Sequence, residues 1–273
     1  MLISGPIGVF DSGVGGLSVL RQIQSQFPQD NLIYLADQQH VPYGPRPLAQ
    51  VRQFSVAITR FLLDQGAKLI VVACNTASAA ALFHLREAFP DVPFVGMEPA
   101  VKPAAEQTQT GVVGVLATPA TFQGRLYASV VERFANDVNL LQDTCPGLVA
   151  QIEKGELQSP KTRAILEGAL TPMLENCIDR VVMGCTHYPF VIPLIQEIVG
   201  PGVKVIDPAP AVARQVGRVL AVLELDNQSS EPGQVRYLTS GDPSNFSALV
   251  GVLLGLEIAA DPVYWQDDVI QSP

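Results

Sequence analysis

The chain has 273 residues, of which 48% are hydrophobic and 16% are charged, and its formal net charge is −9. This hydrophobic fraction is enough to bury a full core, so the composition excludes a disordered chain. Nucleic acids and anionic membranes bind through clusters of lysine and arginine, which an acidic chain of this kind lacks. We therefore predict no nucleic-acid partner and no membrane partner.

The apolar stretches and the cysteines indicate a cytoplasmic protein. The apolar stretch ALVGVLLGLEIAA at 248–260 contains glycines and a glutamate and is too short to span a bilayer. The first residues, MLISGPIGVFDSG, lack the basic and long apolar regions of a secretory signal. The four cysteines have neither CxxC nor zinc-ligand spacing, so we expect free thiols in a reducing compartment and no metal site.

In chain order, short apolar runs rich in β-branched residues alternate with longer amphipathic runs. We predict strands at 6–10, 31–36, 68–73, 93–97, 111–117, 137–142, 179–184, 203–207 and 234–240. We predict helices at 48–65, 76–89, 120–135, 160–176, 189–199 and 208–225. This alternation indicates βαβ units and an α/β fold with mostly parallel sheets flanked by helices. The final residues, DDVIQSP, are expected to fray.

The pattern of strands repeats once along the chain. GVFDSG at 8–13 begins one series and GVLATPA at 114–120 begins another, and each series reaches a strand followed by a cysteine at a similar distance. We interpret the two series as pseudo-symmetric domains. The predicted boundaries of the first domain are 1–98 plus 208–273, and those of the second are 99–207.

The two strand–cysteine turns, LIVVACNT and RVVMGCTH, place Cys74 and Cys185 at equivalent positions. In open α/β sheets, ligands bind beyond the carboxyl ends of strands, where helix N-termini present free N–H groups and partial positive charge. Such a field stabilises a thiolate and lowers a cysteine pKa. The alternative is that each cysteine is a small buried apolar residue. The polar side chains directly after the cysteines are Asn75, Thr76, Thr186 and His187.

The glycine-rich turn DSGVGG at 11–16 follows the first predicted strand. Its glycines permit close approach of another group, but the pattern is neither GxGxxG nor a Walker motif, so it does not indicate a nucleotide site. Asp11 and Ser12 either cap the following helix or face a ligand. An aspartate at this place can orient an ammonium group or set the protonation of a neighbour.

Three further features are candidates for the site. The loop HVPYGPRP at 40–47 is either a rigid connector or a substrate loop that offers the Tyr43 hydroxyl and the Gly44 N–H. His187, two positions after a cysteine, indicates general acid–base chemistry or caps the following helix. Glu153 is a candidate acid, with a structural carboxylate as the alternative.

In these motifs the chain resembles the glutamate racemase family, within the cofactor-independent aspartate/glutamate racemase superfamily. GVFDSGVGGLSVL, DQQHVPYGPRP, ACNTASA, GMEPAVKPA and GCTHYPF occur in the order and spacing of the family, over nearly the whole chain. The resemblance implies two α/β domains that face each other across a cleft, with the active site in the cleft and one catalytic cysteine from each domain. It also implies that no cofactor is needed.

The resemblance extends to individual residues. By position, Cys74 and Cys185 match the two catalytic thiols, Asp11 and His187 match groups that assist the nearer cysteine, and Glu153 resembles a further assisting acid. The positions that match substrate-binding residues are Asp11, Ser12, Tyr43, Gly44, Asn75, Thr76, Thr186 and His187. The implied product is D-glutamate for peptidoglycan in the bacterial cytoplasm, and a homodimer is a further expectation because family members are often dimers.

Racemisation explains why two cysteines are used. One fixed base reaches one face of Cα, whereas a thiolate and a thiol on opposite faces can remove one proton and return another. No Schiff-base motif surrounds any of the five lysines, so N–H and hydroxyl donors in a dry site must stabilise the charge. Three alternatives remain open, namely racemisation of aspartate, a thiol hydrolase with His187 as base, and a non-catalytic binding protein for small acids.

Overall fold

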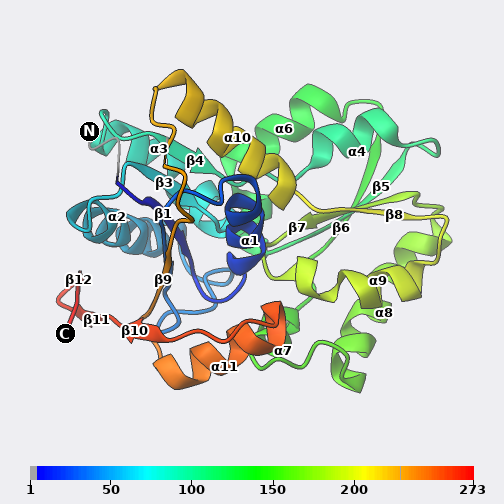
Figure 1. Cartoon of the computed structure of the whole chain (residues 1–273). Coiled ribbons are helices and arrows are strands. Elements are labelled where there is room, and N and C mark those ends of the chain that lie inside the picture. Colours follow the sequence, from blue (N-terminus) through cyan, green and yellow to red (C-terminus); the bar gives the residue numbers. More distant parts are fainter. Residues whose placement is uncertain (1–4, 228) are drawn as a thin grey trace.

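The computed structural model describes residues 5–227 and 229–273, and its strands form two parallel sheets that lie side by side (Figure 1). The six-stranded sheet has the order β10-β9-β2-β1-β3-β4 and consists of β1 (Ile7–Asp11), β2 (Leu32–Ala36), β3 (Leu69–Val72), β4 (Phe94–Gly96), β9 (Val235–Thr239) and β10 (Ala260–Pro262). The four-stranded sheet has the order β6-β5-β7-β8 and consists of β5 (Val112–Ala117), β6 (Asn139–Asp143), β7 (Arg180–Gly184) and β8 (Lys204–Ile206). The predicted α/β class with two parallel sheets is confirmed.

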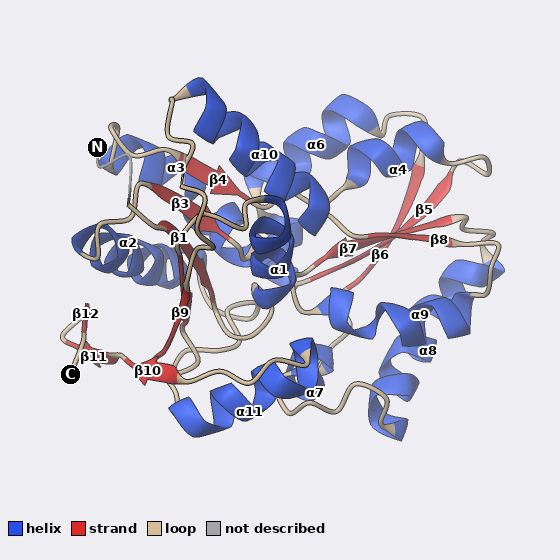
Figure 2. Cartoon of the chain, in the orientation of Figure 1, coloured by secondary structure: helices blue, strands red, loops and turns tan. Residues whose placement is uncertain are grey.

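Helices cover both faces of each sheet (Figure 2). Those around the six-stranded sheet are α1 (Leu17–Gln26), α2 (Leu48–Asp64), α3 (Asn75–Ala88), α10 (Ala209–Val222) and α11 (Pro243–Leu254). Those around the four-stranded sheet are α4 (Val101–Gln107), α5 (Pro119–Gln123), α6 (Arg125–Phe134), α7 (Leu148–Ile152), α8 (Pro160–Glu175) and α9 (Ile192–Val199). Within the described part of the chain, none of the helices combines the length and the apolar character that crossing a bilayer requires.

The two sheets share one strand order, which confirms the internal repeat. The order β2-β1-β3-β4 in the first sheet corresponds to β6-β5-β7-β8 in the second, and all these pairs are parallel. Asp11 and Ala117 end the equivalent strands β1 and β5. Cys74 and Cys185 follow the equivalent strands β3 and β7. Because carboxyl ends of parallel strands lie at one edge of a sheet, the repeat brings both cysteines to ligand-binding edges.

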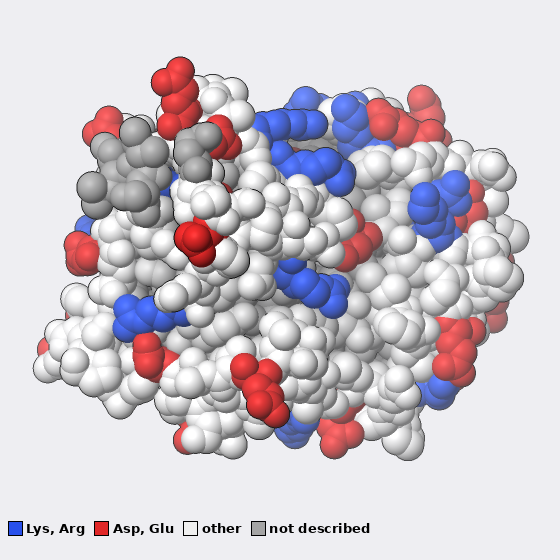
Figure 3. Space-filling view, in the orientation of Figure 1, with Lys and Arg blue, Asp and Glu red and all other residues white. Residues whose placement is uncertain are grey.

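The strands have the composition of sheets covered on both faces. All five residues of β1 and all four of β3 are buried, so these strands read as continuous apolar runs rather than alternating ones. The largest apolar cluster joins the two sheets, since it contains Val9 and Val71 from the first and Val181 and Met183 from the second. Each such side chain contributes about 1.5–3 kcal/mol when it is fully buried. On the face shown in Figure 3, charged side chains of both signs are spread over a largely uncharged surface.

Two predicted helices differ in the structure. The helix predicted at 120–135 is divided into α5 and α6 at Gly124, where an added Cβ would lie 2.5 Å from the Cβ of Ala79 in α3. The helix predicted at 189–199 begins with a 3-10 turn at Tyr188–Val191. The sequence patterns did not predict the short helices α4 and α7, the helix α11, or the strand β10.

The expectation that the C-terminal residues fray is wrong. β11 (Tyr264–Gln266) and β12 (Val269–Gln271) form an antiparallel hairpin that packs on α2. Ile270 belongs to the apolar cluster around α2 and is buried. Trp265 donates a hydrogen bond from Nε1 to Asp37 Oδ1 over 2.7 Å. A buried side chain and a partly buried hydrogen bond thus hold a tail whose sequence is mostly polar.

We predict that Ile270→Ala lowers the free energy of unfolding by about 2 kcal/mol, because it removes buried apolar atoms and leaves a cavity. The neighbouring Val269 is 53% exposed and Ile270 only 5%, so Val269→Ala is the matched control and should change stability by less than about 0.5 kcal/mol. Urea unfolding of both variants measures the difference. Equal stabilities would mean that the hairpin does not pack on α2 in solution.

Candidate active site

The two cysteines lie at the edges where the two sheets meet. Cys74 is the N-cap residue of α3, and its Sγ accepts a hydrogen bond from the Ala77 N–H over 3.4 Å. Cys185 directly follows β7. Both thiols are buried, and the charge of Cys185 contributes to the raised pKa of Cys74. The two thiols are therefore close enough to interact electrostatically, and all four cysteines of the chain are free thiols.

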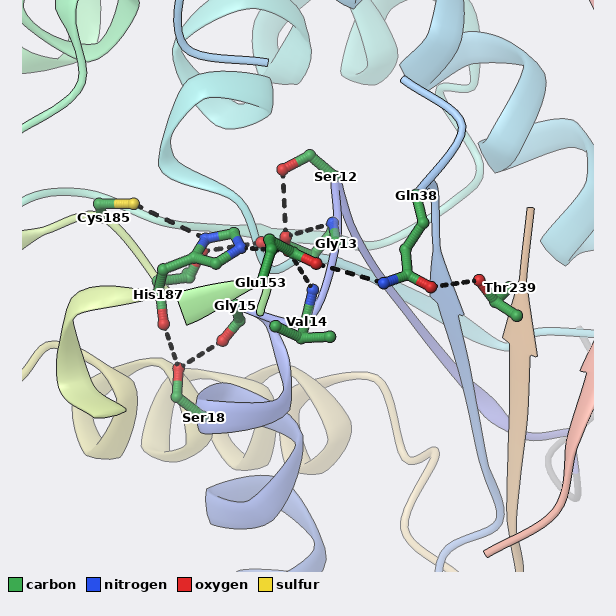
Figure 4. Close-up of polar contacts among 12 residues, drawn as sticks. Ser12, Gly13, Val14, Gly15, Ser18, Gln38, Glu153, Cys185, His187 and Thr239 are labelled. Carbon is green, nitrogen blue, oxygen red and sulfur yellow. Dashed lines mark hydrogen bonds and ion pairs between the residues drawn. The ribbon is translucent and has the colours of Figure 1, made fainter. Parts of the chain in front are cut away.

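Cys185 lies beside a histidine–carboxylate pair (Figure 4). The His187 Nδ1 is 3.8 Å from the Cys185 Sγ, and the His187 Nε2 is 2.6 Å from Glu153 Oε1. Burial alone would lower the pKa of His187, but the hydrogen bonds and charges of Cys185 and Glu153 raise it well above its ordinary value. Both ring nitrogens thus face acceptors, and the imidazolium can donate to a thiolate at Cys185.

Glu153, at the end of α7, is held as a carboxylate by groups from the other sheet. Its Oε1 accepts a hydrogen bond from the Val14 N–H over 2.8 Å, and its Oε2 accepts one from Gln38 Nε2 over 3.2 Å. Burial would raise the pKa of Glu153, but His187, the Val14 N–H and Gln38 together lower it below its usual value. The carboxylate therefore stays charged and stabilises the imidazolium of His187.

Asp11 also connects the two sheets. Its Oδ1 accepts a hydrogen bond from the Gly13 N–H over 2.8 Å, and its Oδ2 accepts one from the Thr186 hydroxyl over 2.8 Å. Burial raises the pKa of Asp11 to about 6, although the charge of His187 and the two hydrogen bonds oppose the shift. Asp11 and Ser12 do not cap α1, which begins at Leu17 without a side-chain cap. Asp11 is thus directed toward the second sheet rather than toward its own helix.

Cys74 is in a different electrostatic environment from Cys185. Burial raises the pKa of the Cys74 thiol well above its ordinary value, and the charge of Asp11 raises it further. The N–H groups of Ala77 and Ser12 favour the thiolate but are too weak to reverse the shift. The sequence-based expectation that the helix N-terminus lowers the pKa is therefore wrong for Cys74, which is a neutral thiol in this site.

Polar side chains beyond Cys74 line the same site. Asn75 is buried, and neither atom of its side-chain amide has a hydrogen-bond partner among the described residues. The Thr76 hydroxyl lies 2.8 Å from that of Thr118, at the end of β5, and Thr118 lies 2.9 Å from that of Thr121. A buried amide without partners costs about 1–3 kcal/mol, which a ligand with suitable groups would offset.

The loop at 40–47 lies against the second sheet, and the Tyr43 hydroxyl has a partner within its own part of the chain. It donates a hydrogen bond to Asp37 Oδ2 over 2.6 Å. A Cβ on Gly44 would lie 2.9 Å from the Thr118 Cβ, so the loop backbone is in close contact with the end of β5. The hydroxyl proton of Tyr43 is therefore already engaged by Asp37, and the predicted role of Tyr43 in substrate binding stays a prediction.

The similarity to known proteins agrees with this geometry. The model of the family described as Asp/Glu/Hydantoin racemase matches residues 7–216. The chain belongs to this racemase family. It is 51% identical over 251 residues to a glutamate racemase from Ectopseudomonas mendocina (strain ymp), with 92% of this chain and 95% of the relative covered.

Two solved structures extend the likeness within the racemase family to the fold. A glutamate racemase isoform from Bacillus anthracis superposes with a TM-score of 0.86 at 31% identity, covering 97% of this chain and 98% of that chain. A glutamate racemase from Francisella tularensis subsp. tularensis SCHU S4 in complex with D-glutamate superposes with a TM-score of 0.84 at 29% identity, with the same coverage. The two-sheet architecture of this chain is therefore that of glutamate racemases.

Some polar residues of this site were not identified from the sequence. Gln38 contacts Glu153, and Ser18 Oγ lies 3.0 Å from the Thr186 carbonyl oxygen. Thr118 is the counterpart of Ser12 in the internal repeat, so the repeat itself could have indicated it. The described residues contain no group of three or more His, Cys, Asp or Glu side chains that could hold a metal ion.

We predict that Asp11→Asn makes the folded protein more stable relative to wild type as the pH rises. The wild-type carboxyl has a pKa of about 6 when folded, against an ordinary value of 3.8, so the folded state binds more protons than the unfolded state and loses stability as the pH rises between these values. The stability difference should change by about 2 kcal/mol in favour of the variant between pH 4.5 and 7.5. Chemical unfolding at both pH values tests this, and a pH-independent difference would contradict it.

We predict that Gly15→Ala lowers racemase turnover by about 10- to 100-fold, because it displaces the turn that holds Cys185. The new Cβ would lie 2.4 Å from His187 Nδ1 and 2.7 Å from Thr186 Oγ1. Gly168 in α8 has no atom within 4 Å of an added Cβ, so Gly168→Ala is the control, with unchanged turnover and a gain of about 0.5–1 kcal/mol in stability. Wild-type turnover in both variants would show that the close approach at Gly15 is unimportant.

Proposed function

We propose that the chain interconverts L- and D-glutamate by a two-base mechanism, in which Cys74 and Cys185 act on opposite faces of the substrate Cα. The observation that carries the proposal is a pair of buried thiols from equivalent strands of two sheets, each with its own acid–base neighbour. Asp11 is the neighbour of Cys74, and His187 with Glu153 is the neighbour of Cys185. Membership of the racemase family and about 50% identity to glutamate racemases support glutamate as the substrate.

Each turnover transfers one proton at each sulfur. In one direction the Cys185 thiolate removes the α-proton, and the Cys74 thiol donates its proton to the opposite face of the resulting carbanion. Cys185 is then the thiol and Cys74 the thiolate, which is the state that catalyses the reverse reaction. The imidazolium of His187 lies 3.8 Å from the Cys185 sulfur and can donate to it, and the neutral form of Cys74 suits its role as the acid.

The two carboxylates of the substrate require hydrogen-bond donors that are already in place before the substrate binds. We assign the α-amino-acid group and the side-chain carboxylate to the donors beyond the two cysteines. Asn75 supports this assignment because both polar atoms of its amide are buried and have no partner among the described residues. Preorganised donors of this kind, in a site without water, stabilise the charge that develops at Cα. The proposed set is Ser12, Gly44 (through its backbone), Asn75, Thr76, Thr186 and, next to them, Thr118; Tyr43 is assigned to positioning the loop.

Access to the buried thiols requires the two halves of the molecule to separate. We propose two domains, one formed by 1–98 plus 208–273 and the other by 99–207. The strands of the first domain form the six-stranded sheet, and those of the second form the four-stranded sheet. The polypeptide passes from the first sheet to the second near residue 99, before α4, and returns near residue 208, after β8. Two crossings allow a hinge motion between the two sheets, which would also part some of the apolar contacts that join them.

The biological role follows from the reaction and the family. D-glutamate is a component of peptidoglycan, so the product serves cell-wall synthesis. We propose the bacterial cytoplasm as the location, and a homodimer as the assembly on the ground of the family alone; light scattering measures the latter. Aspartate is the second candidate substrate, and comparing turnover of L-glutamate with that of L-aspartate decides between them.

We predict that incubation with L-glutamate in D₂O, without added cofactor, yields D-glutamate with deuterium at Cα. Cys74→Ala and Cys185→Ala should each lower racemisation by at least about 10²–10⁴-fold, because each removes one of the two proton-transfer groups. Cys177 is exposed, so Cys177→Ala is the control and should retain full activity. Full activity of either active-site variant, or a covalent adduct on a single cysteine, would contradict the two-base mechanism.

A further inference from the structure

Glu153 is connected to the end of β9 by a chain of hydrogen bonds that passes through one glutamine (Figure 4). The Gln38 amide nitrogen donates to Glu153 Oε2 over 3.2 Å, and its amide oxygen accepts from the Thr239 hydroxyl over 2.9 Å. The Thr239 hydroxyl oxygen in turn accepts from the Gly241 N–H over 3.0 Å. Each group donates in the same direction, toward the carboxylate.

This series of hydrogen bonds leaves the side-chain amide of Gln38 only one orientation in which both of its polar atoms have suitable partners. Because the ionised Glu153 can only accept, the NH₂ group must point at it, and the Gln38 oxygen is left to accept from the Thr239 hydroxyl. Packing also confines the base of the side chain, since a Cβ on Gly241 would lie 2.9 Å from the Gln38 Cβ. A reversed amide would place two oxygens against each other at the carboxylate.

The hydrogen-bond series from Thr239 to Glu153 runs from one sheet to the other. Gln38 lies two residues after β2, and Thr239 ends the neighbouring strand β9, where it is paired with Ala36. Glu153 belongs to the part of the chain that forms the other sheet. Gln38 therefore carries a hydrogen bond from the six-stranded sheet to the carboxylate that holds His187, and β9 adds to the active site although it has no counterpart in the four-stranded sheet.

We propose that Gln38, oriented by Thr239, is a positioning residue that holds the Glu153 carboxylate charged and in place against His187. This inference rests on the proposed roles of Glu153 and His187 in assisting Cys185. Gln38 and Glu153 both line a surface cavity of about 440 Å³, and the Glu153 side chain is 11% exposed. Without Gln38, the carboxylate would face water on this side and could leave His187.

The electrostatics agree with the geometry. The hydrogen bond from Gln38 is among the contacts that lower the pKa of Glu153, with those from His187 and Val14. The titratable groups that interact with this carboxylate are His187, Asp11 and Tyr34, and those that interact with His187 are Glu153, Cys185 and Asp11. Removing the Gln38 donor should therefore raise the pKa of Glu153 and lower that of His187.

The test uses Gln38→Leu in the full-length enzyme, because leucine fills the space and keeps water out. We expect kcat/KM for glutamate to fall about tenfold, as for a lost hydrogen bond to a charged group. The loss must be equal in both directions, since the equilibrium constant of racemisation is one. The pH range in which kcat/KM is high should become narrower. The rise on the acidic side, which Glu153 sets, moves to higher pH, and the fall on the alkaline side, which His187 sets, moves to lower pH.

Companion variants separate positioning from a structural effect. Thr239→Val should narrow the profile in the same way to a smaller extent, and Thr239→Ser, which keeps the hydroxyl, should restore it. Gln39 is exposed and its side chain makes no hydrogen bond among the described contacts, so Gln39→Leu is the matched control with wild-type kinetics. A wild-type pH profile in both Gln38→Leu and Thr239→Val would overturn the proposal, whatever their stability.

Glu153→Gln distinguishes failure of this inference from failure of the proposed function. If Glu153→Gln leaves the pH profile unchanged, the assisting role of Glu153 is wrong and the role of Gln38 falls with it. If Glu153→Gln changes the profile and Gln38→Leu does not, only the role of Gln38 is wrong. In the double variant, the loss of Gln38 should add no further change, since its target is already neutral.

Discussion

The arrangement of the site depends on the hydrogen bonds that the Glu153 carboxylate accepts. It accepts hydrogen bonds from Val14 and Gln38 on the side of the six-stranded sheet and from His187 on the side of the four-stranded sheet. A buried charge is stable only when it is paired and fully hydrogen-bonded, so these partners must come together for the carboxylate to stay ionised. The same condition brings His187, and with it Cys185, to the other sheet. One carboxylate thus joins groups from both sheets beside the Cys185 thiol.

The two cysteines have equivalent places in the fold but different neighbours. Both follow the third strand of a repeat, and both are buried. Cys74 lies near an acid, Asp11, which disfavours its thiolate, whereas Cys185 lies 3.8 Å from the ring of His187, whose own pKa is raised. In the proposed two-base mechanism, one sulfur is a thiolate while the other is a thiol, and unlike neighbours suit this difference better than two identical environments would. Symmetry of the backbone sets the positions, and asymmetry of the side chains sets the charges.

The differences between the two sheets lie in the strands that the repeat does not explain. β9 and β10 extend only the six-stranded sheet, and Thr239 at the end of β9 orients Gln38. The next residue, Ser240, donates to Asp37 over 2.7 Å, and Asp37 also accepts from Tyr43 and from Trp265 of the C-terminal hairpin. The C-terminal segment therefore supports the loop around Tyr43 as well as the carboxylate of Glu153, and it completes the site rather than merely covering the sheet.

Strand patterns, the internal repeat and the motifs around Cys74 and Cys185 were readable in the amino-acid order, because strand periodicity and strand–turn–helix spacing are local properties. The shared strand order and the equivalent cysteines follow from them. Contacts between distant segments were not readable, and they decide the chemistry. Gln38 meets Glu153 across 115 positions and Asp11 meets Thr186 across 175. The neutral form of Cys74, the hydrogen bond of Tyr43 to Asp37 and the packing of Ile270 each depend on burial, which arises only when the folded chain removes water from groups that lie far apart in sequence.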